Sequence, residues 1–468
     1  MVSHIPPTNT RPSCRAHWAR AWVCPLVCLL ACLACSAPER GKVRLEAYSW
    51  WKRPSERNAF ENVLRIYNDS HPGVEVVNQV TDTNADAVRS TLTARLLAGA
   101  APSTFQANAG ADLLRWTVVD TNDDQLPSAS RIEGLSALFG RSGLKTSLYP
   151  PLYDALVAGP ERVPYAVPLN VHRLNVLYFN VAALAAFSAR HDGSSFLERD
   201  VLCPPDLETR LADPQSKLDL KIAVGTNDSF ALTLFALESV LPAVAGAGVY
   251  DDLFRGRQSA GWEQPVRLAL RCVQYLSRSF LDDRDKGWAD ALAQVQTGSA
   301  DFSVMGDWAN GELESALALG EVDACPFPGS SRTFVFTSDT FPLPLAAPYP
   351  SESEAFLDTM ASGEAQLEFS REKGSIPARS DVNVVGLGPR AESARADFMA
   401  ADVSKVLATS GLFPPYYPDE ELNRRLSVMT QAGASDDSVD AVIALLRDAQ
   451  PLLERWQSRL AAGPTSAP

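Results

Sequence analysis

The stretch VPYAVPLNVHRLNVLYFN, residues 163–180, reads as a buried β-strand because apolar residues dominate both of its halves. Three polar residues, His172, Arg173 and Asn175, interrupt its middle. An imidazole, a guanidinium and an amide are costly to bury unless each finds a partner. Either this strand has one wet face, or it passes through a cleft that binds a ligand.

Composition places this stretch in a globular chain of two or more lobes. The 468 residues are 46% hydrophobic and 21% charged, with a net charge of −14. The negative charge and the lack of a basic stripe argue against a general nucleic-acid binder. Beyond the N-terminus, no apolar run of about 18 residues or more predicts a transmembrane helix.

The N-terminus resembles a bacterial lipoprotein signal. A basic segment precedes the apolar stretch AWVCPLVCLLACLAC (21–35), and the polar SAPERGK follows. In such signals a small residue precedes a Cys that becomes lipidated, and both Cys32 and Cys35 fit that position. We expect residues 1–35 to be the signal with its acylated Cys, and 36–42 a tether. An ordinary cleaved signal is the alternative.

Three cysteines remain beyond the signal, Cys203, Cys272 and Cys325. Their spacing fits no metal site, and an odd number cannot pair completely within the chain. Cys272 lies in the helical pattern VRLALRCVQYL and is expected in the core. A disulfide between Cys203 and Cys325 is possible in an exported protein.

From residue 43 onward, strand and helix patterns alternate. VRLEAYS (43–49) and VEVVNQV (74–80) alternate as strands do, and helical patterns follow each of them. This order predicts an α/β layer with a mainly parallel sheet. Ser55 could cap the first helix. Its apolar face is expected to hold Phe60, Val63, Leu64 and Tyr67.

Later segments are predicted from the same patterns. Residues 183–225 are irregular and charged, helices return at 229–245, 263–282 and 286–299, and strands are expected at 301–306 and 332–347.

Five short stretches resemble, in their order after a lipoprotein signal, the extracytoplasmic solute-binding proteins of carbohydrate ABC importers. The glucose/mannose-type branch matches best, over residues 43–415. The stretches are SWWKRPSE (49–56), FQANAG (105–110), VPLNVHRLNVLYFN (167–180), VMGDWANG (304–311) and KGSIPAR (373–379).

The resemblance implies an α/β fold of the two-lobed, type II periplasmic-binding-protein class, with hinge strands between the lobes. The opening stretch would be the first crossing, with His172 and Asn175 facing the cleft and Arg173 paired structurally. Simple alternation puts His172 and Asn175 on opposite faces, so a twist or bulge is required. The expected lobes are 43–165 plus 326–375 and 166–325 plus 376–460, followed by a disordered tail at 461–468.

A sugar site is also implied by the resemblance. Aromatic rings cover the apolar faces of a sugar, while amides, carboxylates and Lys satisfy its hydroxyls. The alternatives are that Trp51 belongs to the core, that Glu56 favours the positive N-terminus of a helix and that Asp307 caps a helix. The expected ligand-binding residues are Trp50, Trp51, Glu56, Gln106, Asn108, His172, Asn175, Phe230, Asp307 and Lys373.

Three positions depart from the glucose-type pattern. Asn108 and Ser410 stand where that pattern has His, and Phe230 with Ala231 stands where it has Trp. The loss of one stacking ring and two donors weakens a glucose assignment but leaves the receptor class in place.

We therefore expect a monomeric receptor, lipid-anchored on the extracytoplasmic face of a bacterial membrane, either periplasmic or at the cell surface. It would close on a carbohydrate and deliver it to ABC permease subunits, with no catalysis and no cofactor or metal. The alternative is a sensor or scaffold lipoprotein that keeps the fold but has no transport role. An enzyme with Glu56 and Asp307 as paired carboxylates is disfavoured because hydrolase motifs are lacking.

Overall fold

The computed structural model describes residues 42–80, 85–117, 130–257, 260–282, 286–400, 406–408 and 419–463. Residues 1–42 and 43–468 separate into two compact units, and only the second is described below. The expected signal, Cys32, Cys35, the Ser410 position and the end of the tail lie outside the described residues. Among the described helices, none combines the length and apolarity needed to span a membrane.

The predicted β-α-β-α opening is confirmed. β1 (Val43–Ser49) pairs in parallel with β2 (Val74–Val80), and α1 (Pro54–Ser70) connects them. The four residues of the expected apolar face of α1 are buried. The expected cap is wrong: Arg53 precedes the helix, Pro54 occupies its first turn and Ser55 lies inside it. A Pro suits this place because the first N–H groups of a helix have no partner within it.

The stretch 163–180 is not one strand but four short ones. β6 (Val163–Pro164), β7 (Ala166–Pro168), β8 (Asn170–Arg173) and β9 (Val176–Asn180) follow one another. The break between β8 and β9 falls at residues 174–175, where the N–H of Val176 donates to the carbonyl of Leu174. This local turn replaces the twist that alternation required.

The remaining strands complete five sheets among the described residues. Their orders are β2-β1-β3, β10-β11-β9-β12, β15-β8-β13-β16, β4-β14-β7 and β5-β6. The further bounds are β3 (Thr104–Phe105), β4 (Ala107–Asn108), β5 (Val157–Ala158), β10 (Ile222–Ala223), β11 (Phe302–Met305), β12 (Val322–Pro326), β13 (Phe334–Thr337), β14 (Asp339–Pro342), β15 (Ile376–Pro377) and β16 (Val406–Ala408).

Buried apolar side chains form two clusters. The first core draws on residues 45–171 and 334–398 together with Trp456. Its helices are α1, α2 (Ala85–Leu97), α3 (Ala111–Leu114), α4 (Ser136–Ser142), α5 (Leu144–Ser147), α6 (Pro150–Asp154), α17 (Pro350–Met360), α18 (Gly363–Lys373) and α19 (Pro389–Ala400).

The second core draws on residues 174–327 and 422–453 together with Val335. Its helices are α7 (Val181–Arg190), α8 (Arg199–Leu202), α9 (Leu207–Ala212), α10 (Ser229–Thr233), the π-helix η1 (Leu234–Val240), α11 (Leu241–Val244), α12 (Ala247–Phe254), α13 (Glu263–Ser277), α14 (Trp288–Gln296), α15 (Ala309–Glu312), α16 (Glu314–Leu319), α20 (Asp419–Met429) and α21 (Asp436–Ala462). The helices expected at 229–245, 263–282 and 286–299 are confirmed.

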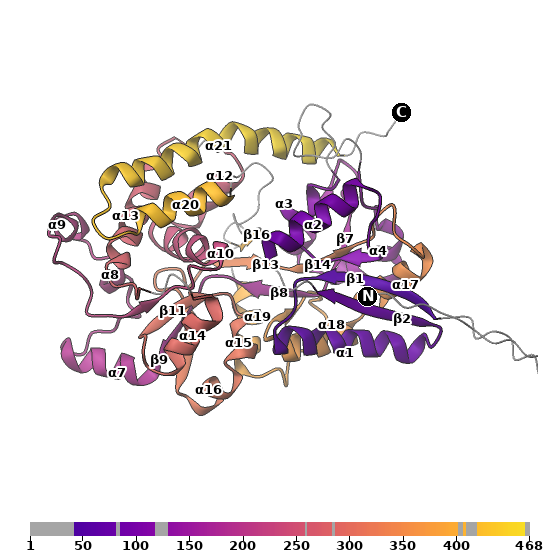
Figure 1. The fold of residues 1–468 in the computed structure, drawn as a ribbon, viewed down its shortest axis with the longest axis horizontal. Helices are drawn as coiled ribbons and strands as arrows, with labels where there is room; N and C mark the ends of the chain where they lie inside the picture. Colours follow the sequence, from indigo (N-terminus) through magenta and orange to yellow (C-terminus); the bar gives the residue numbers. More distant parts are fainter. Residues whose placement is uncertain are drawn as a thin grey trace, which may run out of the picture. The chain divides into compact units, whose positions relative to one another are not determined.

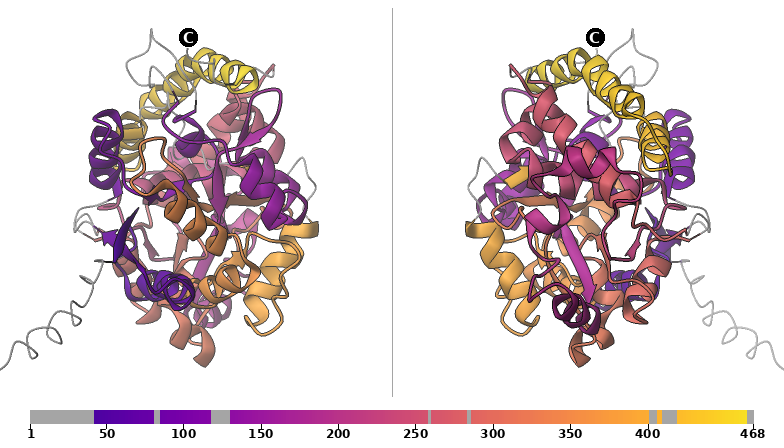
Figure 2. Two further views of the ribbon diagram at one scale, coloured as in Figure 1. Left: turned by 90° about the vertical axis from the view of Figure 1, so that its right-hand side faces the viewer. Right: turned by 90° about the vertical axis from the view of Figure 1, so that its left-hand side faces the viewer.

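Two antiparallel strands connect the cores. Val171 of β8 belongs to the first core and Leu174, just beyond the strand, to the second. β13 runs beside β8 with Thr337 opposite His172, and its Phe336 and Val335 likewise belong to different cores. Helix α21 is a further connection, because it packs along α20 and α13 while its Trp456 enters the first core (Figure 1). Figure 2 shows the same yellow helix from both ends.

The segment after β15 lies differently from the predicted lobe boundary. Ile376, Ala378, Ala391 and Phe398 pack in the first core, although 376–460 was expected with the second lobe. Their neighbours explain this, because Phe398 contacts the rings of Phe334 and Phe336. The exact lobe boundaries stay a prediction.

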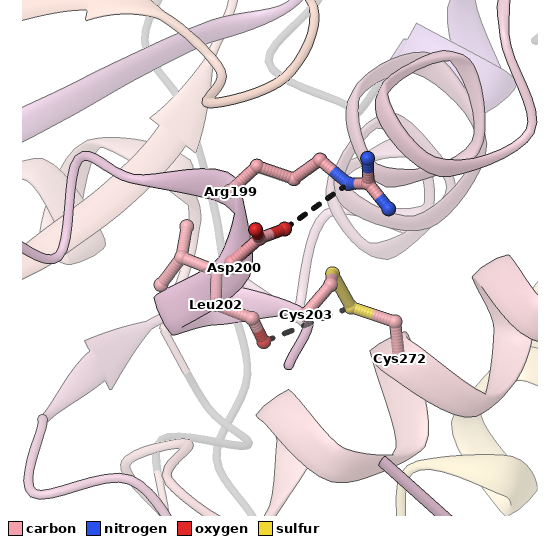
Figure 3. Close-up of a disulfide and its surroundings, with 5 residues drawn as sticks. All are labelled: Arg199, Asp200, Leu202, Cys203 and Cys272. Carbon is pink, nitrogen blue, oxygen red and sulfur yellow. Dashed lines mark hydrogen bonds and ion pairs between the residues drawn. A yellow bond between two sulfur atoms is a disulfide. The ribbon is translucent and has the colours of Figure 1, made fainter. Parts of the chain in front are cut away.

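The disulfide expectation is corrected by the structure. Cys203, at the end of α8, is bonded to Cys272 of α13, with their Cα atoms 5.4 Å apart (Figure 3). Cys272 is fully buried, as its helical pattern predicted, and its sulfur lies 3.8 Å from the carbonyl oxygen of Leu202. Cys325 is a free thiol on β12. Sequence spacing could not reveal that the loop after α7 brings Cys203 back onto α13.

Candidate functional site

A buried ion pair joins the first turn of α1 to the last residue of α18. The ammonium of Lys373 lies 2.7 Å from Oε1 of Glu56, and the two side chains are 3% and 13% exposed. The same ammonium lies 5.9 Å from the ring centroid of Trp51. Gly374 ends α18 at φ +78°, where a side chain would be strained and would meet Asn310. The structure therefore brings two predicted site residues together as a pair.

The two adjacent tryptophans have different environments. Trp51 is buried among Phe60, Phe341 and Phe369, with ring centroids 4.9–5.6 Å away. It belongs to the first core, as the alternative reading of this residue allowed. Trp50 is only partly buried, and its backbone N–H donates to Oε1 of Gln106 at 3.2 Å. Of the pair, Trp50 keeps the exposure that a stacking ring needs.

The side chain of Gln106 is hydrogen-bonded to Asp339, a carboxylate that the sequence did not predict as part of the site. Its Nε2 donates to Oδ1 of Asp339 at 2.7 Å, and Asn170 of β8 donates to Oδ2 of the same carboxylate at 2.9 Å. Burial alone would raise the pKa of Asp339, but the hydrogen bond and charge of His172, with help from Lys373 and Asn170, lower it below its ordinary value. Asp339 is therefore a buried anion with several donors around it.

His172 lies between two carboxylates. Its Nδ1 is hydrogen-bonded to Oδ1 of Asp307, and its Nε2 lies 3.3 Å from Oδ2 of Asp339. The second oxygen of Asp307 accepts the backbone N–H of Arg173 at 2.9 Å. Burial lowers the pKa of His172, yet the charges and hydrogen bonds of both carboxylates outweigh burial and raise it.

These contacts form one continuous polar chain, from the Trp50 backbone through Gln106, Asp339 and His172 to Asp307. Asp339 begins β14 in the sheet that carries Ala107 and Phe341 of the first core. Asp307 follows β11, whose residues belong to the second core. The chain therefore joins polar groups from both cores at the level of the crossing strands.

An aromatic ring that sequence reasoning did not select borders this chain. Trp308 meets His172 edge-on at 5.5 Å and Phe230 at 6.3 Å between ring centroids. Gly306 lies directly under that ring, because an added Cβ would come within 2.1 Å of it. Phe230 thus lies next to the ring of Trp308, and its role in binding stays a prediction. The motif VMGDWANG already contained the ring, but only Asp307 was taken from it.

Two predicted residues lie apart from the polar chain. Asn175 is fully buried, donates to Ser330 and to the Thr333 carbonyl, and accepts the N–H of Val335. Its amide thus closes the loop before β13. Asn108 is partly buried and accepts a hydrogen bond from the hydroxyl of Thr337 at 3.3 Å. It lies on β4 directly opposite Asp339 of β14, so it borders the site through this strand pairing rather than through its amide.

Three further contacts hold elements of the two cores together beside the site. The guanidinium of Arg53 lies 4.4 Å above the ring of Trp288. Ser55 donates to Glu312 at 2.7 Å. Asn310 donates to the carbonyl of Gly374 at 3.1 Å. The N-terminus of α1 and the end of α18 therefore contact α14 and α15 directly.

The donor set suits polar neutral ligands better than a metal. No group of three His, Cys, Asp or Glu side chains in the described part of the chain has the geometry of a metal site. The site combines carboxylates, an ammonium, amides and partly buried aromatic rings. These are the groups that satisfy hydroxyls and cover apolar ring faces.

Comparisons with known proteins agree with this description. A family model described as "Bacterial extracellular solute-binding protein" matches residues 62–392. An uncharacterized ABC transporter extracellular-binding protein of Pyrococcus horikoshii is 28% identical over 338 residues, which is 72% of each chain. A probable sugar-binding periplasmic protein of Mesorhizobium japonicum is 25% identical over 437 residues, which is 90% of this chain and 98% of its own.

The fold is also found among solved structures. A crystal structure of the bacterial solute receptor AcbH superposes with a TM-score of 0.69 at 14% identity, over 89% of this chain and all of that receptor. At this identity the likeness shows the fold alone, which is the two-lobed α/β fold expected from the sequence. The family model and both relatives are described as binding proteins, so the expectation that the chain is not an enzyme is confirmed.

Proposed function

Because the chain belongs to the bacterial extracellular solute-binding proteins, we propose that it binds a sugar between its two lobes and delivers that sugar to an ABC importer. One observation carries the proposal. Residues picked from separate sequence motifs, among them Gln106, His172 and Asp307, lie on one connected polar chain that draws on both cores.

The chemistry of the site fits a sugar. Each hydroxyl needs a donor and an acceptor, and a buried hydroxyl left unpaired costs about 1–3 kcal/mol. Glu56 and Asp307 supply acceptors, and Lys373 supplies an ammonium with three protons. Trp50 and Trp308 are the rings that would cover apolar C–H faces, a role consistent with their partial burial.

Binding would proceed by closure of the lobes. A solute that contacts polar groups from both cores stabilises the closed arrangement by its differential affinity for that state. In the present arrangement the polar groups pair with one another, as Glu56 does with Lys373 and His172 with Asp307. A sugar must therefore replace some of these contacts, and hydroxyls can do so because each both donates and accepts.

The experiment is a thermal-shift screen of the full chain against pentoses, hexoses, disaccharides and sugar acids. A solute at about 100 times its Kd should add roughly 2.7 kcal/mol to the free energy of unfolding. Asp307→Ala should abolish the shift, and Trp50→Ala serves if that variant does not fold. Asp323→Ala is the matched control, because this exposed residue pairs with Arg390 and accepts the backbone N–H of Ala324, and neither partner belongs to the polar chain.

The outcomes separate the two candidate functions. A stabilising sugar whose effect disappears in Asp307→Ala but persists in Asp323→Ala supports the receptor. Silence across the panel, from a chain that melts cooperatively, contradicts it and favours the sensor or scaffold lipoprotein.

We also propose that the receptor is anchored to the membrane by acylation at Cys32 or Cys35, on the extracytoplasmic face. The support is the basic, apolar and small-residue order of the first 35 residues. Labelling cells with an alkyne fatty acid should tag the chain. Loss of the tag in Cys32→Ala but not in Cys35→Ala, or the reverse, identifies the site. An untagged chain released to the soluble fraction overturns the anchor.

A further inference from the structure

Asp339 lies at the centre of the polar chain, and its neighbours occupy most of its acceptor sites. One oxygen accepts from Gln106, and the other accepts from Asn170 and faces His172. The residue is only 5% exposed. A carboxylate has about four acceptor sites, and three are already directed at protein groups. Asp339 is therefore placed to hold the side chains that would contact a sugar, rather than to contact the sugar itself.

The amide of Asn170 has a single permitted orientation. Its Oδ1 accepts the backbone N–H of Asp339 at 2.9 Å, while its Nδ2 donates to the carboxylate of the same residue at 2.9 Å. A flipped amide would set donor against donor and acceptor against acceptor. The orientation brings Nδ2 within 2.8 Å of Nε2 of His172. The Asp339–Asn170 pair thus places an amide nitrogen and a carboxylate oxygen beside Nε2 of His172.

This arrangement satisfies His172 in both of its protonation states. When the ring is doubly protonated, Nδ1 donates to Asp307 and Nε2 to Asp339, and Nδ2 of Asn170 then keeps only its donation to Asp339. When the ring is neutral with its proton on Nδ1, the bond to Asp307 is kept and Nε2 accepts from Asn170. In either state Asp307 keeps the same donor and hence the same orientation. Other ionisable groups beside this arrangement are Lys373, whose charge helps to lower the pKa of Asp339, and Arg173 and Tyr178. Burial lowers the pKa of Arg173 and raises that of Tyr178, and the charge of Asp307 acts to raise both.

We propose that Asp339, with Asn170, is a positioning residue of the solute site. It holds the Gln106 amide on one side and the His172 ring on the other, and through that ring it fixes the direction in which Asp307 presents its carboxylate. The inference rests on the proposed sugar-binding function. It assigns the site a second layer, supplied by β14 and β8, that makes no contact with the solute itself.

The first test needs no solute. Imidazole resonances of the purified full chain are titrated by NMR, and the His172 signal is identified by its absence in His172→Asn. Asp339→Asn should lower the pKa of His172 by about one unit or more, because it removes an opposite charge at hydrogen-bond range. Asp397→Asn is the matched control, since that carboxylate pairs with the neighbouring Arg173 instead. An unchanged His172 pKa in Asp339→Asn overturns the proposal.

The second test measures affinity. Isothermal titration with D-glucose, D-galactose and D-xylose at several pH values should show at least tenfold weaker binding in Asp339→Asn, with an altered pH profile. Asp397→Asn should keep the wild-type profile. Asn170→Ser provides the same readout if Asp339→Asn does not fold. Parallel pH profiles in wild type and Asp339→Asn overturn the positioning role. Absence of binding to any sugar in the wild type, with the NMR shift as expected, instead contradicts the proposed function.

Discussion

Removal of the Cys203–Cys272 disulfide should lower the free energy of unfolding substantially. The bond joins residues that are 69 positions apart. The loop-closure relation for a cross-link of that length gives about 4 kcal/mol, and measured values for native disulfides are typically 2–4 kcal/mol. Both residues are buried in the second core, so the cross-link fixes α8 directly against α13.

The measurement is urea unfolding of the wild type, Cys203→Ala/Cys272→Ala and Cys325→Ala, followed by far-ultraviolet circular dichroism. The free energy of unfolding of the double variant should be about 2–4 kcal/mol lower than that of the wild type. The free energy of unfolding of the wild type should fall by a similar amount when a reductant is present. This comparison separates the effect of the cross-link from the effect of the side-chain volume lost on changing Cys to Ala. Cys325→Ala is the control, because it removes a thiol that forms no disulfide.

Two results would refute this reasoning. One is a free energy of unfolding of the double variant within about 0.5 kcal/mol of the wild-type value, which is the size of effect expected from an ordinary surface substitution. It would show that the bond does not constrain the unfolded chain. A Cys203–Cys325 cross-linked peptide in a non-reducing digest would restore the pairing that the sequence suggested.

Three further outcomes follow from individual contacts. Lys373→Met should lower the free energy of unfolding by about 3–5 kcal/mol because it takes the ammonium partner away from the largely buried carboxylate of Glu56, and Glu56→Gln/Lys373→Met should recover part of that loss in a double-mutant cycle by urea unfolding. Burial raises the pKa of the Cys325 thiol to about 11, so its alkylation by iodoacetamide, followed by mass spectrometry, should be slow at pH 8 and accelerate about tenfold per pH unit up to that pKa. Asn175→Ala should destabilise the chain by about 1–3 kcal/mol yet leave sugar affinity within about twofold, whereas equal losses of affinity in Asn175→Ala and Asp307→Ala would return Asn175 to the site.

Local patterns predicted much of the fold because they are set by neighbours in sequence. The apolar face of α1 follows from a spacing of three and four residues, and β1 from strict alternation. The break after β8 was not predictable in the same way. The chain turns after Leu174, where the side chain of Asn175 is hydrogen-bonded to the loop before β13, about 155–160 residues later in the sequence. No local signal carries that information.

The site shows the same division. Resemblance selected residues whose types suit a sugar, and the structure brings Glu56 to Lys373 and His172 to Asp307. The resemblance could not tell which of Trp50 and Trp51 is available to a sugar, because only the packing of Trp51 against three phenylalanines distinguishes the two rings. Asp339 lay in a strand pattern without any feature that marks a polar centre. Its contacts arise because the start of β14 meets Asn170 of β8, a strand of a different sheet.

The contacts beside the site bear on how strongly any sugar can bind. Arg53 over Trp288 and Ser55 to Glu312 join the two cores without a solute. A cation–π contact contributes about 0.5–1 kcal/mol at exposed sites, and a hydrogen bond a similar amount. Such contacts raise the fraction of molecules that are closed before a solute arrives. Since apparent affinity scales with the fraction of the binding-competent form, their effect depends on which form admits the sugar. If the bound sugar is held by the open form, Arg53→Ala should strengthen binding; if it is held only by the closed form, the same change should weaken binding by about two- to fivefold. The sign of that single change therefore reports which form holds the sugar.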